Sequence, residues 1–152
     1  MTRIDISLKP ITEENWSECI NLKPKDNQKG HVASNINSLE KAKTEPTSKP
    51  YGIYVDNVMV GFTLFDEEPY PDDGYYWIVR LMIDGRYQGN GYGRSAITKI
   101  IDELKKKQEH TKIRISHVPE NVIASKLYKE LGFVETGEII EGEIVLDLII
   151  DN

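Results

Sequence analysis

The chain lacks several features that would assign it to common protein classes. It has 152 residues and a single cysteine, Cys19, which excludes an internal disulfide and a metal site built from several cysteines. No apolar run approaches the roughly 18 residues that span a bilayer. The first ten residues contain no apolar signal-peptide core. We therefore expect one cytoplasmic domain, residues 1–152, with no bound metal and no membrane partner.

The chain also lacks an excess of positive charge. It has 19 Lys and Arg against 25 Asp and Glu, a formal net charge of −6. Binding to nucleic acid needs a basic face that neutralises phosphates, so we expect no nucleic-acid partner. An acidic surface would instead steer a cationic small molecule toward the protein.

The order of the expected elements indicates a mixed sheet covered by helices. Periodicity and turn residues predict a strand over 3–11, a helix over 13–22 capped by Thr12, a helix over 35–43, a hairpin of strands 51–55 and 58–65, a buried central strand over 75–84, a helix through 96–104, a strand over 111–118, a helix from Asn121 to Gly132, and two C-terminal strands joined near Glu141 and Gly142. A hairpin followed by strand–helix–strand–helix–strand favours a sheet with helices packed on it.

The segment YQGNGYGRSA, residues 87–96, has glycines at positions 89, 91 and 93. This spacing satisfies neither the dinucleotide fingerprint G-x-G-x-x-G nor the Walker loop. A strand nevertheless ends here and a helix begins, and the free N–H groups and positive dipole end of a helix attract anions. The pattern predicts a phosphate-bearing ligand. The alternative is a turn that only lets the strand and the helix pack closely.

Two motifs resemble signatures of the GCN5-related N-acetyltransferases (GNAT). In LMIDGRYQGNGYG (81–93), Gln88, Gly91 and Gly93 match the acyl-CoA pyrophosphate loop Gln/Arg-x-x-Gly-x-Gly/Ala. NVIASKLYKELGF (121–133) is similar to the family segment Asn-x-x-Ala-x-x-Leu-Tyr-x-x-x-Gly-Phe. The resemblance implies an α+β fold of αβα layers, with a central mixed, mostly antiparallel sheet flanked by helices. It also implies N-acetyl transfer from acetyl-CoA to a primary amine by direct attack in a ternary complex.

The same resemblance implies where acetyl-CoA binds. The pantetheine arm would lie along the central strand, hydrogen-bonded to its backbone, and the pyrophosphate would lie over the glycine turn. Asn121 would bond the arm, or would only cap its helix. The expected cofactor set comprises Leu81, Met82, Ile83, Gln88, Gly89, Asn90, Gly91, Tyr92, Gly93, Arg94 and Asn121.

The resemblance gives Tyr128 a catalytic role. A phenol within reach of the departing thiolate would protonate or stabilise it; the alternative is that Tyr128 only packs on its helix. The acceptor must also lose a proton, because an alkylamine with a pKa near 10.4 is about one part in a thousand neutral at pH 7. Where some polyamine-acetylating members use a glutamate, this chain has Val79, followed by Arg80. The base stays unassigned, with His117 a candidate base or a packed residue.

Longer segments, among them PITEENWSECINLK and KPYGIYVDNVMVGFTLF, are similar to bacterial spermine/spermidine acetyltransferases. This implies a polyamine such as spermidine or spermine, bound near His31 and the acidic loop 66–74. Asp66, Glu67 and Glu68 are then substrate contacts, or the loop is simply solvated. Another amine (an aminoglycoside, an amino acid or a protein N-terminus) and a non-catalytic acyl-CoA-binding module stay open. The strand-rich C-terminus would suit a homodimer.

Overall fold

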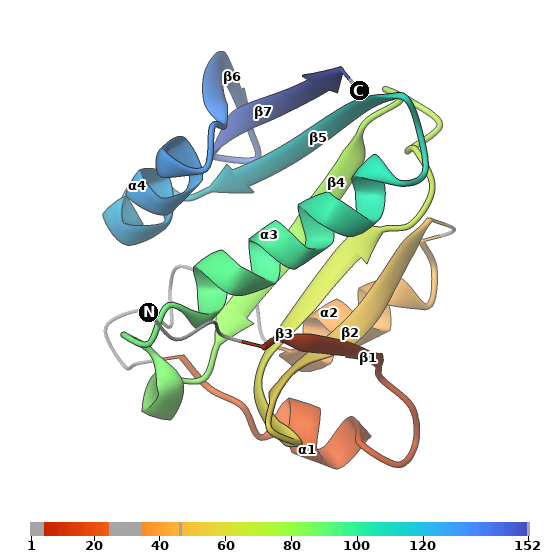
Figure 1. Ribbon diagram of the computed structural model, residues 1–152, viewed down its shortest axis with the longest axis vertical. Helices are drawn as coiled ribbons and strands as arrows, with labels where there is room; N and C mark the ends of the chain where they lie inside the picture. Colours follow the sequence, from red (N-terminus) through yellow and green to blue (C-terminus); the bar gives the residue numbers. More distant parts are fainter. Residues whose placement is uncertain (1–4, 25–34, 46, 152) are drawn as a thin grey trace.

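The computed structural model describes residues 5–24, 35–45 and 47–151 (Figure 1). The helices are α1 (Trp16–Ile20), α2 (Asn35–Ala42), α3 (Tyr92–Lys105) and α4 (Val122–Glu130). The strands are β1 (Ser7–Pro10), β2 (Ser48–Val55), β3 (Val58–Asp66), β4 (Tyr76–Ile83), β5 (His110–His117), β6 (Val134–Ile140) and β7 (Glu143–Asp151). A short 3₁₀ turn, Gly85–Tyr87, links β4 to the glycine turn.

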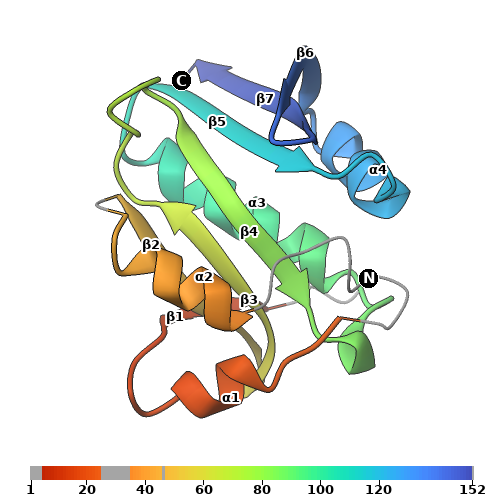
Figure 2. The same ribbon diagram turned by 180° about the vertical axis from the view of Figure 1, so that it is seen from behind.

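The strands form one seven-stranded sheet in the order β1-β2-β3-β4-β5-β7-β6. Neighbouring strands pair antiparallel everywhere except at β4 and β5, which are parallel. Helix α3 crosses one face of the sheet, and α1 and α2 cover the other (Figures 1 and 2). The prediction of an α+β fold with a mixed, mostly antiparallel sheet flanked by helices is confirmed. No helix in the described ranges is long and apolar enough to cross a membrane.

Apolar clusters on both faces of the sheet hold the layers together. On the α3 face, Ile97, Ile100 and Leu104 pack with side chains of β4 and β5, and α4 joins the same cluster. On the opposite face, the buried side chains of α1 and α2 pack against β3 and β4. Cys19 is fully buried in this second cluster, and burial raises the pKa of its thiol to about 12. A thiol that stays protonated is a poor nucleophile, so Cys19 serves packing.

Turn chemistry explains both hairpins. Asp56 and Asn57 join β2 to β3 with φ angles of 48° and 67°, and Glu141 and Gly142 join β6 to β7 with 51° and 81°. Two consecutive positive φ angles match the right-handed twist of the flanking strands. Both turns were predicted at these positions.

The start of α1 differs from the prediction. The helix begins at Trp16, and Thr12 is not its N-cap. Instead, Asn15 Oδ1 accepts a hydrogen bond from the Thr12 backbone N–H at 2.7 Å, and the Asn15 N–H donates to the Thr12 carbonyl at 3.2 Å. These two bonds close a separate turn ahead of the helix. Local side-chain bonding of this kind competes with helix formation.

Candidate active site

The central parallel pair of strands is joined at one end only. Residues 76–78 of β4 pair with residues 113–115 of β5, and beyond them the strands diverge (Figures 1 and 2). β4 nevertheless continues to Ile83. Backbone groups on this stretch of β4 therefore face an opening instead of a neighbouring strand. Buried N–H and C=O groups need partners, so this edge is suited to an extended ligand.

A bulge in β4 lies at the start of this opening. Leu64 of β3 is opposite Arg80, and Phe65 is opposite Ile78, so Val79 is the extra residue. A bulge bends its strand and changes the direction of the side chains that follow. Val79 and Met82 pack with the α1–α2 cluster, whereas Leu81 packs on the α3 side.

The opening continues into a cleft of about 950 Å³. Its walls come from β4, the glycine turn, the ends of β5 and α4, α2, and the β6–β7 hairpin. All residues predicted to bind the cofactor line it except Asn90, and so does Tyr128. Asn90 is exposed, and its side chain donates to the Tyr87 carbonyl at 2.9 Å, which braces the turn.

The glycine turn connects the end of β4 to α3. Gly89 and Gly91 have φ angles of 84° and 79°, where other residues are strained. Gln88 Nε2 donates to the Ile83 carbonyl at 2.9 Å and fixes the turn to the strand. A Cβ on Gly93 would lie 3.8 Å from the nearest atoms of Ile83 and Leu127, an ordinary contact. Packing within the protein therefore does not require glycine at position 93.

The first turn of α3 is suited to an anion. Its N-cap is Gly91, which offers no side-chain cap, and the turn carries no acidic residue. No carboxylate of the first turn itself therefore competes for these amides, and the helix dipole adds positive potential. Arg94 lies here and forms an ion pair with Glu130 of α4 at 2.5 Å. The pair joins α3 and α4 beside the cleft.

Tyr128 projects from α4 into the apolar cluster and the cleft. It is 7% exposed, and its ring lies 6.0 Å from that of His117 and 6.1 Å from that of Phe133. Burial, with a smaller contribution from the charge of Glu143, raises the pKa of its hydroxyl well above the usual range. The phenol therefore keeps its proton at neutral pH. Asn121 caps α4 by accepting from the Ala124 N–H at 3.2 Å.

His117 is held by a hydrogen bond to the backbone. It is 4% exposed, and its Nδ1 lies 2.7 Å from the Val118 carbonyl. Because a carbonyl only accepts, Nδ1 donates this hydrogen bond. Nε2 is buried and has no hydrogen-bond partner among the residues described. His117 also lines the cleft.

The acidic loop does not reach the cleft. Asp66 is 1% exposed, and its carboxylate accepts from the Thr47 and Ser48 hydroxyls and from the Trp77 N–H at 2.7–3.0 Å. Glu67 accepts from the Tyr51 hydroxyl. Neither these residues nor Glu68 line the cleft. Asp66 thus ties β2, β3 and β4 together, because the last residue of β3 faces inward. His31 lies outside the described residues.

Other charged residues do line the cleft, and sequence reasoning did not select them. Lys41 comes from α2, Arg80 from β4, and Glu141 and Glu143 from the β6–β7 hairpin. These positions have no motif of their own, and only the pairing of β7 with β5 brings the hairpin to the site. No group of three or more His, Cys, Asp or Glu suited to a metal ion occurs in the described part of the chain.

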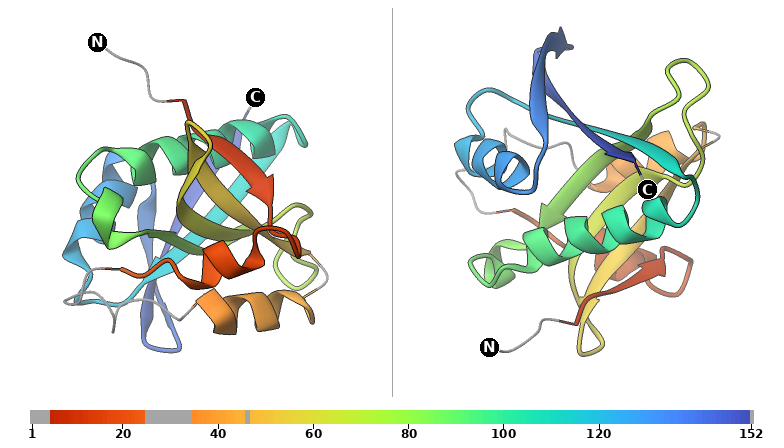
Figure 3. Two further views of the ribbon diagram at one scale, coloured as in Figure 1. Left: turned by 90° about the horizontal axis from the view of Figure 1, so that it is seen from below. Right: turned by 45° about the horizontal axis from the view of Figure 1, so that its top comes forward.

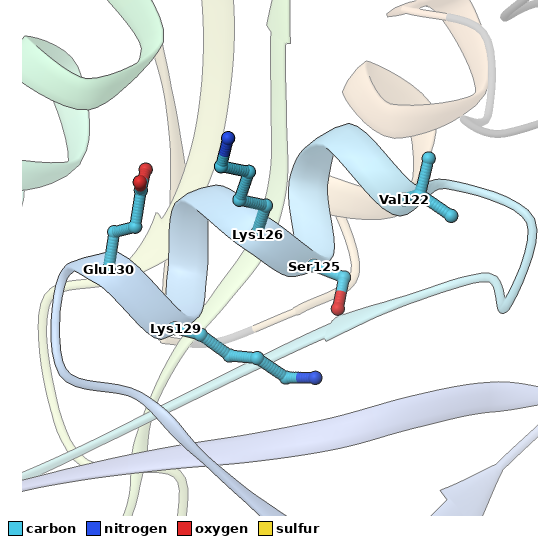
Figure 4. A pocket seen from close by; sticks show the side chains of 5 residues that line it. All are labelled: Val122, Ser125, Lys126, Lys129 and Glu130. Atoms are coloured by element: carbon cyan, nitrogen blue, oxygen red, sulfur yellow. The ribbon is translucent and has the colours of Figure 1, made fainter.

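A second depression, of about 480 Å³, lies on the outer side of α4 (Figure 4). Figure 4 shows its side chains diverging from the helix instead of converging on one point. Lys129 is paired with Glu135 at 2.8 Å, and Glu130 with Arg94. This surface lacks the convergent polar groups of a binding site.

Comparison with known proteins agrees with this geometry. The model of the acetyltransferase (GNAT) family matches residues 8–133. A spermine/spermidine N(1)-acetyltransferase of Bacillus subtilis (strain 168) is 32% identical over 148 residues, covering 94% of this chain and 97% of the relative.

Solved structures share the fold. A domain from Methanocaldococcus jannaschii superposes with a TM-score of 0.77 at 15% identity, covering 97% of this chain and all of that one. Spermidine N-acetyltransferase from Vibrio cholerae, solved in complex with CoA and spermine, superposes with a TM-score of 0.71 at 21% identity. The match covers 95% of this chain and 94% of that one. On the family match and the Bacillus relative together, this chain belongs to the acetyltransferase (GNAT) family.

Proposed function

We propose that this protein transfers the acetyl group of acetyl-CoA to a primary amine by direct attack in a ternary complex. The observation that carries the proposal is the shared cleft: the unpaired edge of β4, the glycine turn and the buried phenol of Tyr128 all line it. An extended thioester with a phosphate-rich end matches these three features in one orientation.

In this proposal the glycine turn and the first turn of α3 hold the pyrophosphate. Free amides at the helix start and the positive dipole end favour negative charge there by about 1 kcal/mol. Leu81, Met82 and Ile83 offer backbone groups to the pantetheine arm, and Asn121 meets the arm from α4. The thioester then lies near the bulge at Val79, where β4 and β5 separate.

Tyr128 serves as the acid in this proposal. Acyl transfer expels a thiolate, which a proton donor within hydrogen-bond reach stabilises. Burial raises the pKa of Tyr128, so its hydroxyl stays protonated throughout the physiological range and can donate a hydrogen bond to the thiolate. Its ring is fixed by packing in the core cluster, so the donor is held in place before the reaction.

For the acceptor we propose a linear polyamine such as spermidine or spermine. The Bacillus relative is named for these substrates, and the net charge of −6 would attract a polycation. One observation favours a different primary amine as second candidate: Lys41 and Arg80 line the same cleft, and like charges repel a polycation there.

The test is release of CoA thiol from acetyl-CoA with spermidine, spermine, an aminoglycoside, amino acids and a peptide N-terminus, using wild type beside Tyr128→Phe. Release that saturates with a polyamine and falls in the variant supports the proposal. Saturation only with an amino acid or a peptide assigns the second candidate. Acetyl-CoA binding with no release from any amine would identify a non-catalytic acyl-CoA-binding module instead.

We also propose a homodimer formed through the C-terminal strands. All of β6 is exposed, although it carries apolar side chains: Val134 and Ile139 are each 68% exposed. The β6–β7 hairpin stands out from the body of the domain (Figure 3, right). Exposed apolar side chains on an edge strand are suited to a second copy. Light scattering that gives the monomer mass at working concentration would contradict the dimer.

A further inference from the structure

In the part of the chain that the structure describes, three carboxylates line the cleft, and they differ in what they contact. Glu130 is paired with Arg94. Glu141 is exposed in the β6–β7 turn. Glu143, the first residue of β7, is half-buried, and its Oε1 accepts a hydrogen bond from the Ser116 hydroxyl at 3.0 Å. Of the three, Glu143 is therefore both fixed in position and without a cationic partner among the described residues.

Asp147, a second carboxylate on the same face of β7, has a structural role and serves as a comparison for Glu143. Asp147 is four residues along the strand, so its side chain is on the same side as that of Glu143. Asp147 accepts two hydrogen bonds from Arg114, at 2.7 and 2.9 Å. Glu143 lines the cleft, and where Asp147 has the guanidinium of Arg114, Glu143 has only the neutral hydroxyl of Ser116. A partly desolvated carboxylate without a cation favours a cation from elsewhere.

The position of Glu143 is suited to the acceptor end of the cleft. Ser116 lies on β5 just beyond Ile115, the last residue of β5 paired with β4, so Glu143 lies where the two strands separate. Its charge is also close enough to Tyr128 to contribute to the raised pKa of that hydroxyl. Among the described residues, the opposite wall supplies no carboxylate, because β4 has Val79 and Arg80 at this level.

We propose that Glu143 binds the ammonium group of the acceptor and takes up its proton, an inference that rests on the proposed acetyl transfer. Ser116 fixes one carboxylate oxygen and leaves the other for the amine. Lys41 and Arg80 on the far wall turn the ammonium toward this side. Among the described residues, the charged groups that line the cleft with Glu143 are Glu141 in the turn, Lys126 and Glu130 of α4, Arg94 of α3 and, across the cleft, Arg80 and Lys41. The other titratable groups that line it are His117, Tyr87, Tyr92 and Tyr128.

The acceptor enters as R–NH₃⁺ and gives one proton to Glu143, which passes it to the solvent. The nitrogen lone pair then forms the C–N bond to the acetyl carbon while the C–S bond breaks. Tyr128 donates its proton to the leaving thiolate. The remaining surplus proton on nitrogen leaves through Glu143 and replaces the one that Tyr128 gave. The products are the acetylated amine, the CoA thiol and one proton.

Glu143→Gln tests this role because the amide keeps the size of the side chain and can still accept from Ser116. At pH 7 we expect kcat/KM for the best acceptor to fall about 100-fold, a usual value for loss of a general base. The KM for acetyl-CoA should not change. The difference in kcat/KM between Glu143→Gln and wild type should become smaller as the pH rises toward 10, because the acceptor in solution then loses its proton without the enzyme.

Glu135→Gln is the matched control: Glu135 is an exposed carboxylate of the same hairpin, paired with Lys129 and outside the cleft. Its kinetics should equal wild type. If kcat/KM of Glu143→Gln stays within twofold of the wild-type value at every pH, the inference is overturned. It is also overturned if His117→Asn, instead of Glu143→Gln, abolishes the fall of kcat/KM at low pH. If wild type acetylates no amine, the proposed function fails first and the inference falls with it.

Discussion

The two sides of the cleft are assembled in different ways. The side proposed for acetyl-CoA comes from two short segments, residues 81–94 and 121–128, each a strand–turn–helix or helix-start unit. The side proposed for the acceptor combines single residues from α2, β4, β5 and the β6–β7 hairpin. Local backbone geometry creates the first, whereas sheet topology creates the second.

The difference also appears in the groups that each side offers. The cofactor side offers mainly backbone: free helix amides, a bare turn and an unpaired strand edge. The side proposed for the acceptor offers charged side chains, and those in the described residues are two basic ones from α2 and β4 and two acidic ones from the hairpin. Backbone groups change little with side-chain substitution, so the cofactor side is the part that a family can keep while its acceptor changes.

The largest expected effect tests whether the acidic loop belongs to the acceptor side. Asp66→Ala removes a buried carboxylate and leaves three donors without a partner, which should lower the free energy of unfolding by about 3 kcal/mol. Glu68→Ala, an exposed control, should stay within about 0.5 kcal/mol of wild type. Both should keep the acceptor KM, measured well below the melting temperature. A higher KM for Asp66→Ala without lost stability would return Asp66 to the acceptor site.

Tyr128→Phe tests the junction of the two sides. It keeps the ring in the apolar cluster and removes only the donor, so turnover should fall at least about tenfold, roughly 1.4 kcal/mol of transition-state stabilisation. CoA binding and the melting temperature should hardly change. Tyr70→Phe, in the loop before β4, is the control. Unchanged turnover in Tyr128→Phe would leave this side chain a packing role alone.

Gly93→Ala separates the fold from the ligand on the cofactor side. The added methyl makes only ordinary contacts at 3.8 Å, and alanine favours a helix, so the melting temperature should not fall. CoA affinity by calorimetry should drop about fivefold, the worth of roughly one hydrogen bond, because the methyl group holds the pyrophosphate off the turn. Thr98→Ala on the same helix is the control. Equal affinity would mean that the pyrophosphate does not approach the backbone at position 93.

The smallest expected effect concerns Asn121, which caps α4. Asn121→Ala should cost roughly 0.5–1 kcal/mol of stability through the lost bond to the Ala124 N–H, and Asn121→Asp should restore it, since aspartate caps as well as asparagine. If the Asn121 amide also bonds the pantetheine arm, both variants should have a higher KM for acetyl-CoA than wild type, and Asn121→Asp should recover only the stability. Recovery of both would reduce Asn121 to a cap.

The sequence predicted best what short stretches encode. The two hairpin turns, the position of β4 at the centre of the sheet and the cap at Asn121 follow from local chemistry. The acceptor side could not be predicted in this way. Glu143 acquires its neighbours only because β7 pairs between β5 and β6, and the inward turn of Asp66 depends on hydroxyls 18 and 19 residues away.

Within the described chain, three residue pairs carry the strand pairing that joins β1–β4 to β5–β7. The sheet therefore consists of two halves that are hydrogen-bonded to each other at one end only, and a ligand bound between β4 and β5 would connect them at the other end. Its binding energy adds to global stability, by about 2.7 kcal/mol when the free ligand is at 100 times its Kd. Amide hydrogen exchange along residues 79–83 should then slow on addition of CoA. The amides of the three β4–β5 pairs should be equally protected with and without CoA.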